Sequence, residues 1–156
     1  MRYFLHGILA AALFALLANA AFAQTTWDAM QSFGLTGTWS PSCKTAASPS
    51  NYWMTYYLDA SGVVRRRVDL GPDRANLMNA VDSARIMTST TIDTHIRNDD
   101  PGYGETNGLV FDVVLVKENG RVRTLVSTGS DGKEYIKGGI VAANGQPSVW
   151  LEKCRQ

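Results

Sequence analysis

The sequence predicts an all-β protein, a single antiparallel meander barrel of eight or nine strands with a short N-terminal helix. From Leu35 onward, short runs rich in Val, Ile, Thr, Tyr and Trp are separated by clusters of Gly, Asn and Asp, a pattern typical of successive hairpins. No repeat, linker or low-complexity segment divides residues 24–156, so we expect one domain. An open sheet of so many strands leaves exposed edges, and closure into a barrel removes them.

Residues 1–23 have the features of a secretory signal peptide. Arg2 precedes an apolar stretch over residues 8–18, and Ala21-Phe22-Ala23 is the small-x-small pattern that a signal peptidase accepts. The apolar stretch is too short for a membrane-spanning helix, which needs about 20 apolar residues. We therefore expect cleavage near Ala23 and a periplasmic or secreted protein without a stable membrane anchor.

Charge and motifs exclude several classes of function. The chain has 15 Lys and Arg against 14 Asp and Glu, and a net charge of +1 creates no field that attracts nucleic acid or an anionic membrane. No Gly-x-Ser-x-Gly motif or calcium-binding loop occurs, and Asp93 and His95 beside an acidic loop are more typical of a solvated turn than of a metal site. We expect neither an enzyme nor a protein that holds a metal or a cofactor.

The first element after residue 23 is predicted to be a short helix. Trp27, Met30 and Phe33 repeat at a spacing of three, and Thr26 before them is a suitable N-cap. A helix with one apolar face must cover another part of the protein. We therefore expect this helix to pack against the barrel.

A hairpin follows within residues 51–70. Ala60-Ser61-Gly62 fits a three-residue loop, a type I turn followed by Gly in the left-handed conformation. The register set by this loop gives the hairpin one apolar and one mostly polar face, as a sheet with one buried side requires. The apolar face pairs Leu58 with Val64, Tyr56 with Arg66, Met54 with Val68 and Tyr52 with Leu70, and the other face pairs Asp59, Tyr57, Thr55 and Trp53 with Val63, Arg65, Arg67 and Asp69.

Two further strands are expected within residues 77–96. Their break is predicted near Asp82 or Ser83, although residues 77–81 fit a helical turn equally well. The polar residues 97–108 then predict a long loop at the surface.

A second hairpin turns at Asn119-Gly120, the strongest short signal for a type I′ turn. It sets Glu118 opposite Arg121. Turns at residues 129–132 and 144–145 follow, and they separate strands near 133–140 and 148–154. These strands complete the meander.

Cys43 and Cys154 predict a disulfide. Both lie in the exported part of the chain, where an oxidising compartment favours a pair over free thiols. In an eight-stranded barrel the last strand runs antiparallel to the first, which places the two thiols at opposite rims. Either the segment from Ser40 to Cys43 folds back, or the number of strands is odd.

Gly37 and Trp39 form a Gly-x-Trp motif soon after the predicted helix. This opening resembles the lipocalin-like, or calycin, barrels, and the resemblance implies a Trp across the barrel base and an interior that takes a small ligand. With its two cysteines, the pattern also resembles small exported proteins of Gram-negative bacteria with no assigned activity. The avidin family opens similarly, but Pro41-Ser42-Cys43 does not continue its biotin-contacting pattern, so we expect no biotin site.

Arg66 is the candidate ligand-binding residue, together with Tyr56 and Tyr52. The hairpin register places Arg66 on the apolar face, where a charge needs a partner. Three arrangements satisfy this requirement or remove it. The guanidinium binds an anionic group of a ligand inside the barrel, it pairs with a buried Asp93 or Asp112, or the register is wrong and it lies in solvent.

These observations lead to three hypotheses of function. The first is a periplasmic lipocalin-like protein that binds a small apolar or anionic amphipathic ligand in its barrel. The second is a non-enzymatic interaction protein with a protein partner in the periplasm, such as an inhibitor of an extracellular hydrolase, since small disulfide-closed barrels also serve as lysozyme inhibitors. The third is a side-chain-filled barrel with a structural role. Interior volume separates the first from the others, because an eight-stranded barrel is either filled or holds one small ligand.

Overall fold

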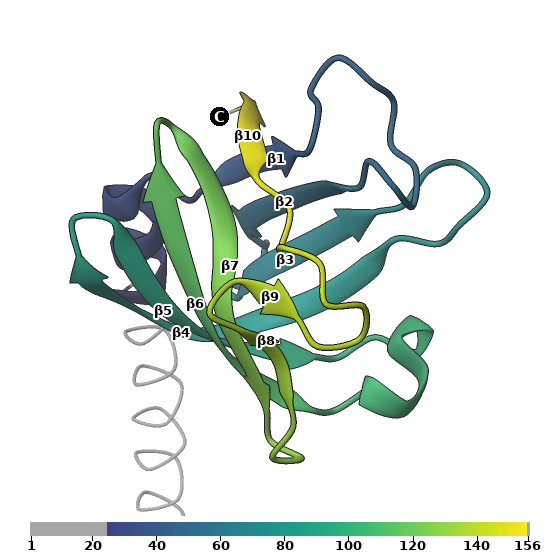
Figure 1. Ribbon diagram of the computed structural model, residues 1–156. Helices are drawn as coiled ribbons and strands as arrows, with labels where there is room; N and C mark the ends of the chain where they lie inside the picture. The colour runs from purple at the N-terminus through teal and green to yellow at the C-terminus, as the bar shows by residue number, and fades with distance from the viewer. Residues whose placement is uncertain (1–24, 156) are drawn as a thin grey trace, which may run out of the picture.

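The computed structural model describes residues 25–155, which form a closed antiparallel β-barrel with a short helix at one end (Figure 1). The fold class predicted from the sequence is confirmed. The expected signal peptide, residues 1–23, lies outside the described residues, so its cleavage stays a prediction. Within the described part of the chain, no helix combines the length and hydrophobicity needed to span a membrane.

Eight strands form the closed ring. Each pairs antiparallel with the next, and the last of them pairs with both the first and the seventh. Two short strands form a ribbon that continues from the seventh. The ring consists of β1 (Gly37–Ser40), β2 (Trp53–Leu58), β3 (Val64–Asp69), β4 (Leu77–Thr88), β5 (Thr91–Asn98), β6 (Val110–Glu118), β7 (Arg121–Gly129) and β10 (Leu151–Arg155), and the ribbon of β8 (Glu134–Lys137) and β9 (Ile140–Val141).

The N-terminal helix, residues 25–33, packs against one end of the barrel, as its apolar face predicts. Met30 and Phe33 of the helix, Leu35 after it and Trp39 of β1 are almost completely buried and belong to one apolar core. The indole N–H of Trp39 donates to the Leu35 carbonyl over 2.7 Å. The Trp of the Gly-x-Trp motif is thereby fixed to the segment that joins the helix to β1.

Two lysines bind the C-terminal end of this helix. Lys117 of β6 donates to the Phe33 carbonyl over 2.7 Å, and Lys153 of β10 donates to the Gly34 carbonyl over 2.9 Å. Carbonyls at a helix C-terminus lack partners within the helix and carry partial negative charge, so ammonium groups stabilise them. Burial, and secondarily the charge of Lys117, lowers the pKa of Lys153.

The first hairpin has the register that its sequence predicts, from Leu58 opposite Val64 through Tyr56 opposite Arg66 to Met54 opposite Val68. Gly62 in its loop has φ 80°, the left-handed conformation expected there. Inward and outward side chains therefore alternate on β2 and β3, and Arg66 is the charged residue on the inward face of this hairpin.

The carboxylate of Asp59 organises the loop of this hairpin. It accepts hydrogen bonds from the Ser61 hydroxyl over 2.6 Å, from the Arg65 guanidinium over 3.0 Å and from the backbone N–H groups of Ser61 and Val63, each over 2.9 Å. These donors, the Ser61 hydroxyl first, hold the pKa of Asp59 well below its usual range. The loop is therefore fixed by a charged group at neutral pH.

The prediction for residues 77–96 is correct in its two strands and wrong in the position of their break. β4 continues to Thr88, and the turn lies at Ser89 and Thr90; no helical turn forms at its start. The chain passes Asp82 through a register shift between Val81 and Ser83. The Asp82 carboxylate points to the outer face and accepts two hydrogen bonds from Arg97 of β5, so a charged residue at this point does not end the strand.

The second hairpin is confirmed, with Glu118 opposite Arg121 and both Asn119 and Gly120 at positive φ, as a type I′ turn requires. The polar loop that precedes it contains a short 3-10 helix, η1 (Pro101–Thr106). The loop was expected to begin at Arg97, but Arg97 and Asn98 belong to β5 and Asn98 is buried. Most residues from Asp99 to Gly108 are exposed, as expected.

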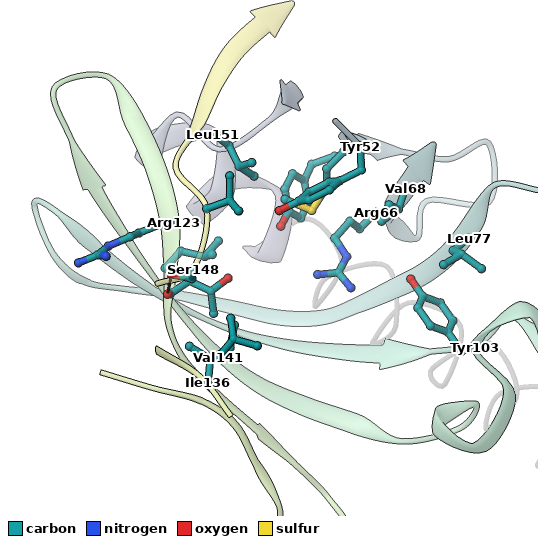
Figure 2. A pocket seen from close by; sticks show the side chains of 15 residues that line it. Tyr52, Arg66, Val68, Leu77, Tyr103, Arg123, Ile136, Val141, Ser148 and Leu151 are labelled. Atoms are coloured by element: carbon teal, nitrogen blue, oxygen red, sulfur yellow. Dashed lines mark hydrogen bonds between the residues drawn. The ribbon is translucent and has the colours of Figure 1, made fainter. Parts of the chain in front are cut away.

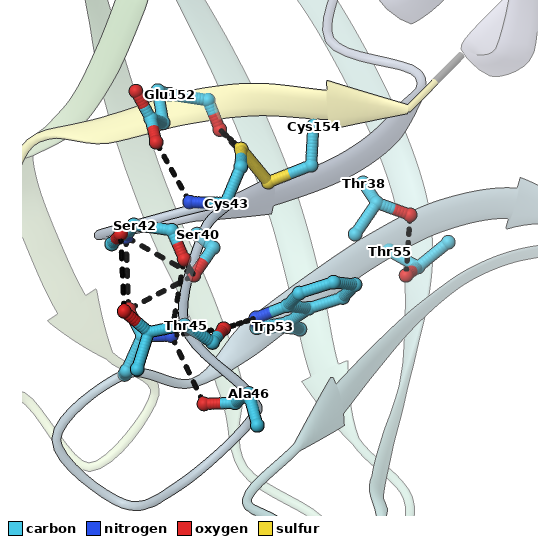
Figure 3. The surroundings of a disulfide bond; sticks show 11 residues. Thr38, Ser40, Ser42, Cys43, Thr45, Ala46, Trp53, Thr55, Glu152 and Cys154 are labelled. Atoms are coloured by element: carbon cyan, nitrogen blue, oxygen red, sulfur yellow. Dashed lines mark hydrogen bonds between the residues drawn. A yellow bond between two sulfur atoms is a disulfide. The ribbon is translucent and has the colours of Figure 1, made fainter.

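Cys43 and Cys154 form the predicted disulfide, with their Cα atoms 5.3 Å apart. The ring has an even number of strands, so the fold-back of the segment after β1 explains the pairing (Figure 3). The buried amide of Asn51 holds this segment: it accepts from the Ser42 N–H over 2.8 Å and donates to the Thr45 carbonyl over 2.9 Å. The Cys43 N–H then donates to a carboxylate oxygen of Glu152 on β10 over 2.7 Å, which aligns the two cysteines.

We predict that the double variant Cys43→Ser/Cys154→Ser is less stable than the oxidised protein. The disulfide joins residues 111 positions apart, and for a loop of that length the chain-entropy model gives at most about 4–5 kcal/mol of stabilisation. Urea denaturation measures the loss. Reducing agent should lower the midpoint of the wild type and leave the double variant unchanged; equal midpoints for oxidised wild type and double variant would contradict the prediction.

We predict that Gly62→Val destabilises the protein by more than about 1 kcal/mol, because a β-branched residue is strained at positive φ. A Cβ atom at this position meets nothing within 4 Å, so steric overlap does not contribute. Gly62→Asn is the matched control, since Asn tolerates the left-handed region. Thermal denaturation should rank the proteins wild type, Asn variant, Val variant; a Val variant as stable as the Asn variant would refute the backbone explanation.

Candidate functional site

Two adjoining cavities lie among the inward side chains of the barrel, and no residue of the N-terminal helix lines either of them. The larger has a volume of about 320 Å³ and is shown in Figure 2. The smaller has a volume of about 280 Å³. Arg66 of β3 and Tyr103 of η1 line both of them, so these two side chains stand at the junction.

The two cavities share strands β3, β6, β7 and β8, but apart from Arg66 different residues of these strands line them. The larger is lined by the residue before β2, by side chains of β2, β3, β4, β6, β7 and β10, and by the ribbon of β8 and β9: Tyr52, Met54, Val68, Leu77, Leu115, Thr124, Ile136, Val141 and Leu151. The smaller is lined mainly from β5, β6 and β7: Ile96, Asn98, Phe111, Val113 and Ser127, with Tyr135 of β8. Aliphatic and aromatic groups dominate both walls.

Arg66 projects into the larger cavity from β3 (Figure 2). Its place opposite Tyr56 in the register turns it inward, whereas its neighbour Arg67 is exposed on the outer face. Its Nε–H donates to Asn79 Oδ1 over 2.8 Å. The sequence therefore placed Arg66 on the correct face, and the alternative of a fully solvated residue does not hold.

No carboxylate among the described residues forms a salt bridge with Arg66. The two aspartates considered as partners pair elsewhere, Asp93 with Arg85 over 3.6 Å and Asp112 with His95. Among the described residues, Arg66 thus carries its charge into an apolar cavity with the Asn79 amide oxygen as its acceptor, and its guanidinium lies close to the Tyr56 hydroxyl.

A buried amide network fixes the guanidinium. Asn79 Oδ1 accepts from Arg66 Nε and also from the Tyr103 hydroxyl, over 2.7 Å. The Asn79 amide nitrogen donates to Asn98 Oδ1 over 2.6 Å, and the Asn98 amide nitrogen donates to the carbonyl and hydroxyl of Thr106. Since a guanidinium only donates hydrogen bonds, Arg66 sets the direction of each hydrogen bond between the side chains of Asn79, Asn98 and Thr106. Arg66 and Tyr103 are held by one shared oxygen.

Tyr56 and Tyr52 bring two phenols to the same region, as the sequence predicted. Tyr56 is 1% exposed, and its hydroxyl finds no hydrogen-bond partner within the part of the chain that the structure describes. Burial raises the pKa of Tyr56, and the positive charge of Arg66 offsets this only in part. Burial likewise raises the pKa of Tyr52. Both phenols therefore stay protonated at neutral pH and are available as donors.

Neither Tyr103 nor Asn79 was predicted from the sequence as part of the site. Tyr103 lies in a polar loop whose fold over the barrel cannot be inferred from local pattern. Asn79 offered one weak indication. It shares one face of β4 with Leu77 and Val81, and a buried amide on that face needs hydrogen-bond partners.

The arrangement offers hydrogen-bond donors to an acceptor inside an apolar space. The terminal nitrogens of Arg66 and the hydroxyl of Tyr56 suit a carboxylate or a similar anionic group. Among residues 25–155, no group of three or more His, Cys, Asp or Glu side chains is placed to hold a metal ion.

Comparisons of the chain with models of protein families, with curated protein sequences and with solved structures find no match. The likeness to lipocalin-like barrels therefore rests on the closed antiparallel ring and the Gly-x-Trp opening.

We predict that Tyr56→Phe and Tyr103→Phe change stability in opposite directions in the absence of ligand. The first removes a buried hydroxyl without a partner and should raise the free energy of unfolding by up to about 1 kcal/mol. The second removes a hydrogen bond to Asn79 and should lower it by about 1 kcal/mol. Urea denaturation measures the free energy of unfolding of both variants. A destabilised Tyr56→Phe variant would show that the Tyr56 hydroxyl forms a hydrogen bond in the folded protein.

Proposed function

We propose that the protein binds a small amphipathic molecule with an acidic group inside its barrel, and that it acts by binding without catalysis. The observation that carries this proposal is the Arg66 guanidinium, which faces an apolar cavity and forms no salt bridge with a carboxylate of residues 25–155. A charge in such surroundings is costly unless an opposite charge meets it. A ligand carboxylate supplies that charge and accepts the free donors of Arg66 and Tyr56.

The cavity has the volume and lining of a ligand site. Small-molecule pockets are concave, mostly apolar and have a few converging polar groups. A cavity of about 150 Å³ holds benzene, so the larger cavity, of about 320 Å³, accommodates an aliphatic group of about twice that size. This volume favours binding over the hypothesis of a barrel filled by its own side chains.

We also propose that binding takes place outside the cytoplasm. A disulfide such as Cys43–Cys154 persists in oxidising compartments, and this supports the secretory signal predicted in residues 1–23. Native mass spectrometry of the protein isolated from the periplasm or medium of a secreting host would detect a retained acid directly as an added mass.

We predict that Arg66→Met weakens the binding of decanoate by roughly ten- to a hundredfold, the effect of one charge-assisted hydrogen bond of about 1.5–3 kcal/mol. Arg67→Met is the matched control, because it removes the same charge from the outer face of the same strand. Isothermal titration calorimetry measures both variants, and circular dichroism confirms their fold. Equal losses in the two variants would reduce the role of Arg66 to a general charge effect, and no binding of decanoate by the wild type would refute the proposed function.

A further inference from the structure

The two cavities meet at the group that would bind the acid. Arg66 lines both, and the remaining walls differ, with Leu115 and Thr124 in the larger cavity and Val113 and Ser127 in the smaller. An anionic group bound to the guanidinium therefore has apolar space on two sides. A ligand with one chain can extend to one side only.

The partition between the cavities is fixed in place. Arg66 and Tyr103 both donate to Asn79 Oδ1, and Asn79 is completely buried. In the wall of the smaller cavity, the rings of Phe111 and Tyr135 pack edge to face with centroids 5.2 Å apart. The smaller cavity is thus bounded by side chains that have partners of their own, which favours a permanent space over a transient one.

We propose that the ligand is a two-armed acid, with its anionic group at Arg66 and one apolar arm in each cavity. This inference rests on the proposed function and adds to it the shape of the ligand. A linear acid leaves the smaller cavity without an apolar occupant, whereas an acid branched next to its carboxyl group fills both. The branch point then lies at the junction that Arg66 and Tyr103 form.

Two isomeric ten-carbon acids test this directly. Decanoate and 2-butylhexanoate have the same atoms and charge, so a difference in affinity reports shape. We expect calorimetry to show about tenfold tighter binding of 2-butylhexanoate, the effect of roughly two additional methylene groups removed from water. Equal affinities, or tighter binding of decanoate, would overturn the inference and leave the proposed function intact. Binding of neither acid would overturn both.

Two substitutions on β7 assign the arms to the cavities. Ser127→Leu fills the smaller cavity, so it should weaken the binding of 2-butylhexanoate more than that of decanoate and thereby abolish the advantage of the branched acid. Thr124→Leu, the matched control, intrudes on the larger cavity and should weaken both acids. If Ser127→Leu does not fold, as judged by circular dichroism, the smaller Ser127→Val takes its place. An undiminished advantage of 2-butylhexanoate in the folded Ser127 variant would overturn the two-armed assignment.

Discussion

Closure of the ring by β10 is the constraint on which the interior depends. β10 meets β7 through only two residue pairs, Leu151 with Val122 and Glu152 with Arg121, while its pairing with β1 is reinforced by the disulfide. Farther along, β7 pairs with β8 instead of β10. The ribbon of β8 and β9 and the segment after it therefore complete the barrel wall next to β7. That segment is joined to β7 by the Ser148 hydroxyl, which donates to the Thr124 carbonyl over 2.5 Å. The short contact between β7 and β10 is thus the reason that the ribbon, rather than strand pairing, forms part of the cavity wall.

Within this frame, a single amide oxygen determines the chemistry of the interior. Asn79 Oδ1 satisfies Arg66 and Tyr103 as donors but brings no negative charge. An aspartate at this position would have formed an internal ion pair and neutralised the cavity. The neutral amide orients the guanidinium and leaves its charge for another group. The Arg66 guanidinium can therefore be held in place and still lack a neutralising charge, because a hydrogen bond to a neutral amide orients it without compensating its charge.

The parts of the fold that could be predicted from sequence are those set by local chemistry. The loops at Gly62 and Asn119-Gly120 determine their own registers, and alternation then places Arg66 inward, so the core of the candidate site followed from one hairpin. The break expected at Asp82 was wrong because Arg97, on the neighbouring strand, stabilises a bulge there. Tyr103, the fold-back before Cys43 and the cavities themselves depend on contacts between distant segments. No local pattern records such contacts.

The position of β10 at the end of the sequence also determines when the barrel can close during synthesis and folding. The ring closes only when residues 151–155 pair with β1, more than a hundred positions earlier, and the disulfide spans a separation of 111 residues. Contacts of such long range form late, because loop closure must precede them. A chain still emerging from the ribosome therefore has the first seven strands of the ring but lacks the closing strand, β10. Such a chain stays open, and its two thiols can pair only once residue 154 has reached Cys43, so formation of the disulfide marks the completion of the barrel.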